Sequence, residues 1–176
     1  MKELEFLLDK IDKYFFEISL EAHKEASLDL VGHEYIATPI PFIVNALNGI
    51  KERESIENKR FLDVGSGVGN ICAVANYLGL NAEGIELNPV LFNISEQIHS
   101  NIKIHNLDIR DFNSYENYDL IFYFLPFFDE NLQKELKAKI ENNCKIGAYI
   151  IVLGQENKDD RFVNIHQRQV WQKIKK

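Results

Sequence analysis

The chain of 176 residues carries 20 basic and 27 acidic side chains, a net charge of −7, and 45% of its residues are hydrophobic. This length and apolar content suit one globular domain, and the acidic balance disfavours nucleic acid, because a phosphate backbone requires a dense cationic surface. The two cysteines and five histidines show no metal-ligand or disulfide spacing, and no stretch reaches the ~18 apolar residues of a membrane span. We therefore expect a cytoplasmic protein with no structural metal and no membrane span, and with Cys72 as a small buried residue.

The first 59 residues differ in pattern from the rest. Apolar side chains recur at three- and four-residue steps through residues 1–30, among mostly acidic neighbours, which predicts an amphipathic acidic helix. The prolines of Thr38-Pro39-Ile40-Pro41 can begin a helix but not continue one, so residues 34–41 form an extended connection to a second helix around residues 43–50. We expect residues 1–59 to form an N-terminal helical appendage within the same domain.

Short apolar runs alternate with helical patterns over residues 60–176, which we expect to form the core. The predicted helices are Asn70–Leu80, Pro89–Ser100 and Glu130–Asn142. The predicted strands are Arg60–Val64, Ala82–Leu87, Ile102–Leu107, Leu120–Leu125 and Ala148–Leu153, followed by a weaker pair at Phe162–Gln167 and Gln169–Ile174 with solvated outer faces.

This alternation predicts an α/β protein, a Rossmann-like doubly wound sheet that is mostly parallel, with an antiparallel C-terminal strand. Open sheets of this kind bind ligands at the carboxyl ends of their strands, where the strand order reverses. Functional residues are therefore expected directly after each strand.

A glycine-rich turn follows the first predicted strand. Gly65, Gly67 and Gly69 let the backbone turn sharply into a helix and approach a ligand closely. Their even spacing departs from the G-x-G-x-x-G of dinucleotide-binding proteins. Asp63 would repel a pyrophosphate but could accept hydrogen bonds from an ammonium group. The turn therefore favours a cationic ligand.

Acidic residues also end the next two strands. Glu86 lies where an acid can bind the two hydroxyls of a ribose, and Pro89 then begins a helix. Asp108 could meet an adenine amino group, with Leu87 and Ile109 against its rings. The fourth strand ends in an aromatic lip, from which Tyr123, together with Tyr35, is placed to reach a substrate nitrogen.

These motifs resemble the class I, seven-strand S-adenosylmethionine-dependent methyltransferases over residues 34–176. Within that superfamily they look closest to the archaeal and mitochondrial seven-strand protein lysine methyltransferases, which share D-x-G-S-G, E-x-N-P, an aromatic-x-x-P ending at Pro126 and a T-P element at Thr38. The resemblance implies Tyr35, Tyr123 and Pro126 on the catalytic side. The cofactor-binding residues that it implies are Thr38, Asp63, Gly65, Ser66, Gly67, Gly69, Asn70, Glu86, Leu87, Asn88, Asp108, Ile109 and Tyr123.

The expected reaction is methyl transfer from S-adenosylmethionine to a nitrogen, the ε-amine of an exposed lysine in a basic protein. Val68 and Asn70 replace an acid and an arginine of the lysine methyltransferases, so a non-catalytic S-adenosylmethionine-binding module stays open. A small-molecule methyltransferase stays open too. The fourth strand lacks the Asn/Asp-Pro-Pro-aromatic ending of enzymes that methylate nucleic-acid bases, and a dinucleotide-binding oxidoreductase is disfavoured by the glycine spacing.

Overall fold

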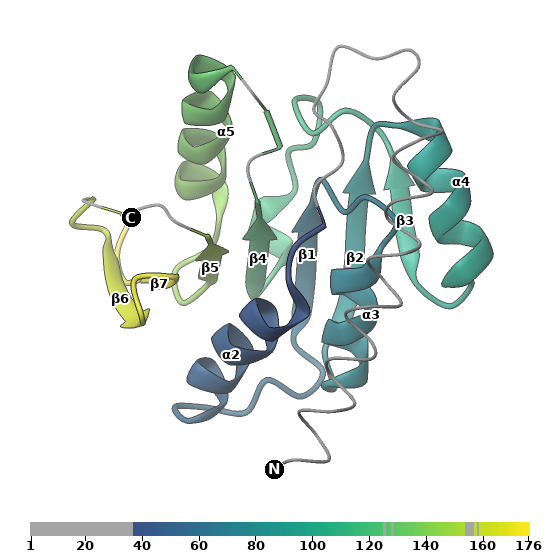
Figure 1. Cartoon of the computed structure of the whole chain (residues 1–176). Coiled ribbons are helices and arrows are strands. Elements are labelled where there is room, and N and C mark those ends of the chain that lie inside the picture. Colours follow the sequence, from purple (N-terminus) through teal and green to yellow (C-terminus); the bar gives the residue numbers. More distant parts are fainter. Residues whose placement is uncertain (1–36, 125, 128, 154–156, 158) are drawn as a thin grey trace.

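The computed structural model describes residues 37–124, 126–127, 129–153, 157 and 159–176. Seven strands form one sheet in the order β3-β2-β1-β4-β5-β7-β6 (Figure 1). All neighbours pair in parallel except β7, which is antiparallel to both β5 and β6. The strands are β1 Arg60–Val64, β2 Asn81–Glu86, β3 Lys103–Asn106, β4 Leu120–Tyr123, β5 Tyr149–Val152, β6 Phe162–His166 and β7 Val170–Lys173.

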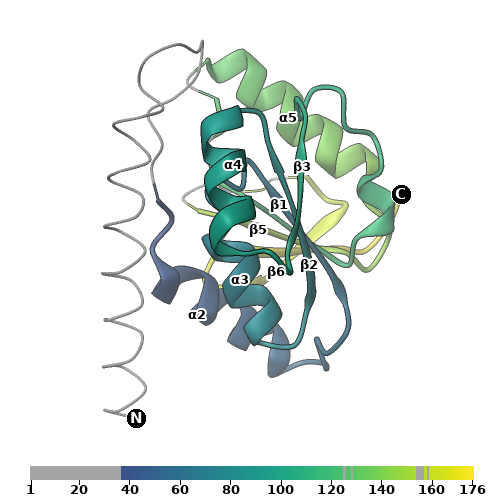
Figure 2. The same ribbon diagram turned by 90° about the vertical axis from the view of Figure 1, so that its right-hand side faces the viewer.

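Helices cover both faces of the sheet (Figure 2). One face carries α2 (Ile40–Lys51), α3 (Asn70–Tyr77) and α4 (Pro89–Ile98). The other carries α5 (Glu130–Asn143) and the short 3-10 helix η1 (Tyr115–Asn117). The expected doubly wound architecture with an antiparallel C-terminal strand is therefore confirmed.

Several element boundaries follow from local sequence signals. Asn88 begins α4 because its side chain accepts hydrogen bonds from the first backbone N–H groups, and Pro89 follows at the first helical position. The helix α3 ends at Tyr77, earlier than expected, and Gly79 reverses the chain there with φ of +95°. The predicted helix in residues 1–30, Tyr35 and Leu125 lie outside the described residues.

The sheet separates two apolar cores, one on each face. Five residues of α2 are buried in the core beneath α3, so this helix belongs to the main body of the domain: Ile40, Ile43, Ala46, Leu47 and Ile50. The second core lies beneath α5 and includes Leu62, Val64, Ile85 and Tyr123. The continuous apolar strands are thus explained by burial on both faces.

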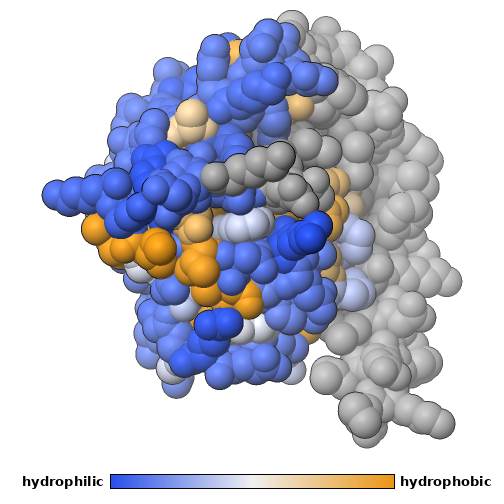
Figure 3. Space-filling view, turned by 90° about the vertical axis from the view of Figure 1, so that its left-hand side faces the viewer, coloured by the Kyte–Doolittle hydropathy of each residue, from blue (hydrophilic) through white to orange (hydrophobic). Residues whose placement is uncertain are grey.

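The pair β6–β7 forms one edge of the sheet. The expected solvated outer faces are found on β6, where Val163 is 41% exposed, but not on β7, whose Trp171 and Lys173 are buried. The Lys173 ammonium donates hydrogen bonds to carbonyl groups at the end of α5, including that of Cys144 at 2.8 Å. Figure 3 views the molecule from this edge and shows a band of apolar surface between polar regions.

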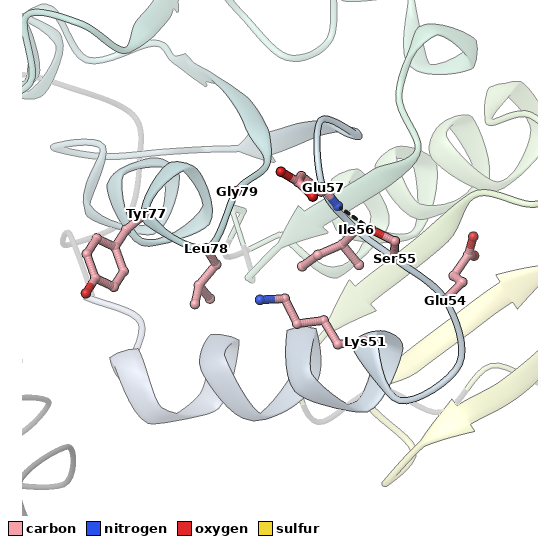
Figure 4. Close-up of a pocket in the computed structure, with 8 residues that line it drawn as sticks. All are labelled: Lys51, Glu54, Ser55, Ile56, Glu57, Tyr77, Leu78 and Gly79. Atoms are coloured by element: carbon pink, nitrogen blue, oxygen red, sulfur yellow. Dashed lines mark hydrogen bonds between the residues drawn. The ribbon is translucent and has the colours of Figure 1, made fainter.

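A cavity of about 420 Å³ lies at the amino ends of β1 and β2. Figure 4 shows Lys51 of α2 extending towards Leu78 after α3, whereas Tyr77 points away. The segments that line this cavity precede β1 and β2, so it lies at the opposite end of the sheet from the glycine turn. None of the helices in the described part of the chain combines the length and the apolar character needed to cross a membrane.

Candidate functional site

The glycine turn follows β1 at the point where the strand order reverses, between β2 and β4. Gly65, Gly67 and Gly69 have φ of +84°, +55° and +82°, a backbone conformation that residues with a Cβ rarely adopt. The backbone N–H groups of Gly65 and Ser66 donate to the carbonyl oxygen of Ile85 at 2.9 and 2.8 Å. The turn is therefore fastened to β2, and its shape requires the glycines.

Glu86 joins the end of β2 to this turn. Its Oε2 accepts a hydrogen bond from the N–H of Gly67, and its Oε1 accepts one from the N–H of Asn88, both at 2.8 Å. The residue is 9% exposed, and burial raises the pKa of its carboxyl although the backbone N–H groups oppose this rise. Each carboxylate oxygen keeps a lone pair that could accept a hydrogen bond from a hydroxyl group.

Asp63 lies under the same turn, on the α3 face of β1. It is 2% exposed, and the contact found for its carboxylate is the Cys72 thiol, with Sγ 3.9 Å from Oδ2. Burial, and then the neighbouring charge of Glu86, raise the pKa of Asp63 to about 8. Among the described residues no Lys, Arg or His forms an ion pair with it. A cationic ligand nearby would favour the ionised form.

The third strand end contains an ion pair between Asp108 and Arg110. The guanidinium of Arg110 donates to both carboxylate oxygens of Asp108, with Nε 3.0 Å from Oδ1 and 2.9 Å from Oδ2. The pKa of Asp108 is lowered by this contact. The expected adenine acceptor is therefore already paired with a neighbouring cation.

The two apolar residues expected against adenine lie in different surroundings. Leu87 is 47% exposed at the end of β2, where a ring could cover it, whereas Ile109 is buried in the core beneath α5. Asn106 donates to the carbonyl oxygens of Glu86 and Leu87 at 2.9 and 3.1 Å and so holds this strand end. The structure brings Leu87, but not the Ile109 side chain, to the open end of the sheet.

Two further loop residues face inward. The Ser66 side chain lies against Gly84 of β2, where an added Cβ would be 2.6 Å from its Oγ. The Asn70 side chain is buried, and its Oδ1 lies 3.3 Å from Nε2 of His99. Asn88 acts as the cap of α4 through its side chain and as a donor to Glu86 through its backbone. These contacts fix the shape of the glycine turn on the side that faces β2 and α4.

The residues expected near the substrate do not lie together in the structure. Pro126 lies over Gly65, since a Cβ added to that glycine would be 3.2 Å from the Cβ of Pro126. Tyr123 is only 1% exposed and packs in the core beneath α5, so its side chain is not brought to the strand ends. Thr38 is half-buried in the segment that leads into α2. Tyr35 lies outside the described residues.

Sequence reasoning missed three residues that complete the site: Gly84, Asn106 and His99. Gly84 alone had a visible signal, because a glycine inside a strand marks a close approach of another segment. Asn106 and His99 act on groups that are distant in sequence, so neither has a local pattern that identifies it. Among the described residues no cluster of His, Cys, Asp or Glu could hold a metal ion.

Comparisons with known proteins support the fold. No protein-family model matches the sequence, and no curated protein matches it either. Solved structures do resemble it, including a TehB-like SAM-dependent methyltransferase from Corynebacterium glutamicum (20% identity, TM-score 0.52, 61% of this chain and 60% of that one). An RNA methyltransferase from Salinibacter ruber in complex with S-adenosyl-L-homocysteine aligns over 79% of this chain and 92% of its own, with 16% identity and a TM-score of 0.57.

A glycopeptide N-methyltransferase, MtfA, complexed with S-adenosyl-L-methionine, aligns with 11% identity and a TM-score of 0.53 over 69% of this chain and 59% of that one. The chain spans 60% of the Corynebacterium protein and 53% of Streptomyces venezuelae DesVI, which is less than two thirds of either. At these identities the comparisons establish the architecture: the chain has the fold of S-adenosylmethionine-dependent methyltransferases.

Proposed function

We propose that the protein transfers the methyl group of S-adenosylmethionine to a nitrogen, the ε-amine of a lysine in another protein. The observation that carries the proposal is the hydrogen bond from Gly67 to Glu86, which fixes the glycine turn beside two buried carboxylates at the switch point of the sheet. The similar solved structures support S-adenosylmethionine as the cofactor, because three of them are complexes with S-adenosylmethionine or S-adenosylhomocysteine.

The described residues fit such a cofactor. The open lone pairs of Glu86 would accept the ribose hydroxyls, and exposed Leu87 would cover the adenine. Asp63 lies under the glycine turn and would stabilise the positive charge on the amino-acid end of the cofactor, because its buried carboxylate has no cationic partner among the described residues. When bound, the sulfonium supplies an activated methyl group.

The protein then has to place a neutral amine in line with that methyl group, at ~3–3.5 Å, and exclude water. Lysine has a reference pKa of ~10.4, and an apolar environment lowers it by disfavouring the charged form. Phe124 and Phe127, both half-buried after β4, and Pro126 over Gly65 would provide that environment.

A basic protein acceptor is favoured by charge. The net charge of −7 would attract a basic protein and disfavour nucleic acid. A small-molecule acceptor is the second candidate, because a sugar N-methyltransferase is among the similar structures (15% identity, TM-score 0.54, 68% of this chain and 49% of that one).

The cofactor assignment is tested by isothermal titration calorimetry with S-adenosylmethionine. Glu86→Gln should weaken binding at least about tenfold, because an amide replaces one acceptor oxygen with a donor. Glu96→Gln is the matched control, since Glu96 is exposed on α4. Equal affinity of wild type and Glu86→Gln would remove Glu86 from the site.

The acceptor is tested by incubating the protein with methyl-labelled cofactor and a cell extract. Label on lysine residues of polypeptides supports the proposed acceptor, whereas label only in low-mass material supports a small-molecule methyltransferase. Cofactor binding without transfer to either fraction would mean a non-catalytic binding module.

A further inference from the structure

The third glycine of the turn is packed against α4. Gly69 is the N-terminal cap of α3, with φ of +82°. A Cβ added there would lie 3.3 Å from Cδ2 of His99 and 3.6 Å from Cβ of Ser95, both in the last turn or cap of α4. The absence of a side chain at Gly69 therefore lets the turn and α4 meet closely, in addition to allowing its backbone conformation.

A polar contact accompanies this packing. Oδ1 of Asn70, a buried residue, lies 3.3 Å from Nε2 of His99. The amide oxygen can only accept, so Nε2 is assigned as the donor. The backbone of His99 is itself held, because its N–H donates to Ser95 and its carbonyl oxygen accepts from Ile102. Burial lowers the pKa of His99, which favours the neutral ring.

The opposite end of α4 contacts the same turn by another route. Asn88 caps α4 with its side chain, and its N–H donates to Glu86, whose other oxygen accepts from Gly67. The turn is thus tied to both ends of one helix, through Glu86 at the start of α4 and through His99 at its end. A rigid helix between two such contacts fixes the distance between Glu86 and the start of α3.

We infer that His99 is a positioning residue, which holds Gly69 and Asn70 so that the turn is already shaped for the cofactor. This inference rests on the proposed function. His99 would act on the cofactor through the turn. By holding the turn in its bound shape, it would reduce the conformational entropy that the turn loses when the cofactor binds. Loss of its side-chain contact should therefore weaken cofactor affinity more than it lowers the stability of the fold.

The experiment is a double-mutant cycle read by calorimetry with S-adenosylmethionine and, separately, S-adenosylhomocysteine. His99→Leu removes the donor at similar size and should raise both dissociation constants about tenfold, because Asn70 is left buried without its partner. His99→Gln keeps a donor nitrogen and should restore most of the affinity. Asn70→Leu removes the acceptor, and combined with His99→Leu it should add little further loss.

Thermal unfolding without cofactor, measured on every variant, separates positioning from a purely structural role. A structural role alone would lower the melting temperature of His99→Leu while the folded protein kept wild-type affinity, and that result would overturn the inference. Asn70→Leu against wild type provides the same comparison if His99→Leu does not fold. A wild-type protein that binds neither ligand would instead contradict the proposed function.

Discussion

Asp63 and Glu86 are two buried carboxylates under one glycine turn, and the charge of Glu86 makes ionisation of Asp63 harder. Glu86 has two backbone N–H donors, whereas the contact found for Asp63 is the weak donor of Cys72. Burial and the charge of Glu86 accordingly raise the pKa of Asp63 to about 8. The pair therefore links protonation to stability and to ligand binding.

The stability of the free protein should fall as the pH rises. Folded Asp63 has a pKa of about 8, above its ordinary value of 3.8, so between these values the folded state binds more protons than the unfolded state. The stabilisation is present below the lower value and is lost as the pH rises through the upper one. Asp63→Asn should remove this loss and be more stable than wild type by a few kcal/mol at pH 8.

Urea unfolding of wild type and Asp63→Asn between pH 5 and pH 9 checks this expectation. The advantage of Asp63→Asn should grow by about 1.4 kcal/mol per pH unit from pH 5 to about pH 8, because folded Asp63 is protonated there and the unfolded chain is ionised, and it should level off towards pH 9. Parallel curves over the whole range would contradict a raised pKa at Asp63.

Cofactor binding below pH 8 should release a proton. The positive charges of S-adenosylmethionine favour the ionised form of Asp63, so its proton leaves when the ligand binds. Calorimetry at pH 6.5 in buffers of different ionisation enthalpy measures this release directly. Asp63→Asn should release less than wild type. Identical release by both would assign the proton to another group.

Gly84→Ala should destabilise the fold by about 1–3 kcal/mol, the usual range for overpacking. An added Cβ would lie 2.6 Å from Oγ of Ser66 and 2.7 Å from Cδ1 of Ile104, so both neighbours would have to shift. Thermal unfolding measures the loss. Ser66→Gly combined with Gly84→Ala should recover part of it, because it removes one of the two clashes. Full stability of Gly84→Ala would mean that the turn can move away from β2.

Glu83 should stabilise the protein at neutral pH. Its side chain is 19% exposed and pairs with Arg60 and His105, each at 2.9 Å. Burial alone would raise its pKa, but the hydrogen bonds from His105 and Arg60 outweigh this and lower the pKa to about 2. The stabilisation is therefore present above its ordinary value of 4.5 and is lost as the pH falls through about 2.

Glu83→Gln should cost about 1–2 kcal/mol at pH 7 and less at pH 3. Chemical unfolding at the two pH values provides the comparison, with exposed Glu57 changed to Gln as the control. A loss that is the same at both pH values would indicate a packing effect instead of a charge effect.

The sequence by itself determined the order of strands and helices and the positions of the site's acids. The strand Arg60–Val64 and the helix beginning at Pro89 are as predicted, because runs of apolar residues, prolines and caps act locally. The carboxyl ends of parallel strands meet at one edge, so the sequence alone predicts Asp63 and Glu86 near the glycine turn.

Only the tertiary structure decided which face each side chain occupies and which distant group it meets. A period of two cannot tell one buried face from the other, so Tyr123 was expected at the substrate and lies in the core beneath α5. The contact of Asn70 with His99 joins residues 29 positions apart, so no local pattern specifies it, whereas Asp108 pairs with Arg110 only two residues along the chain. These contacts, formed on folding, decide which strand-end residues remain available to a ligand.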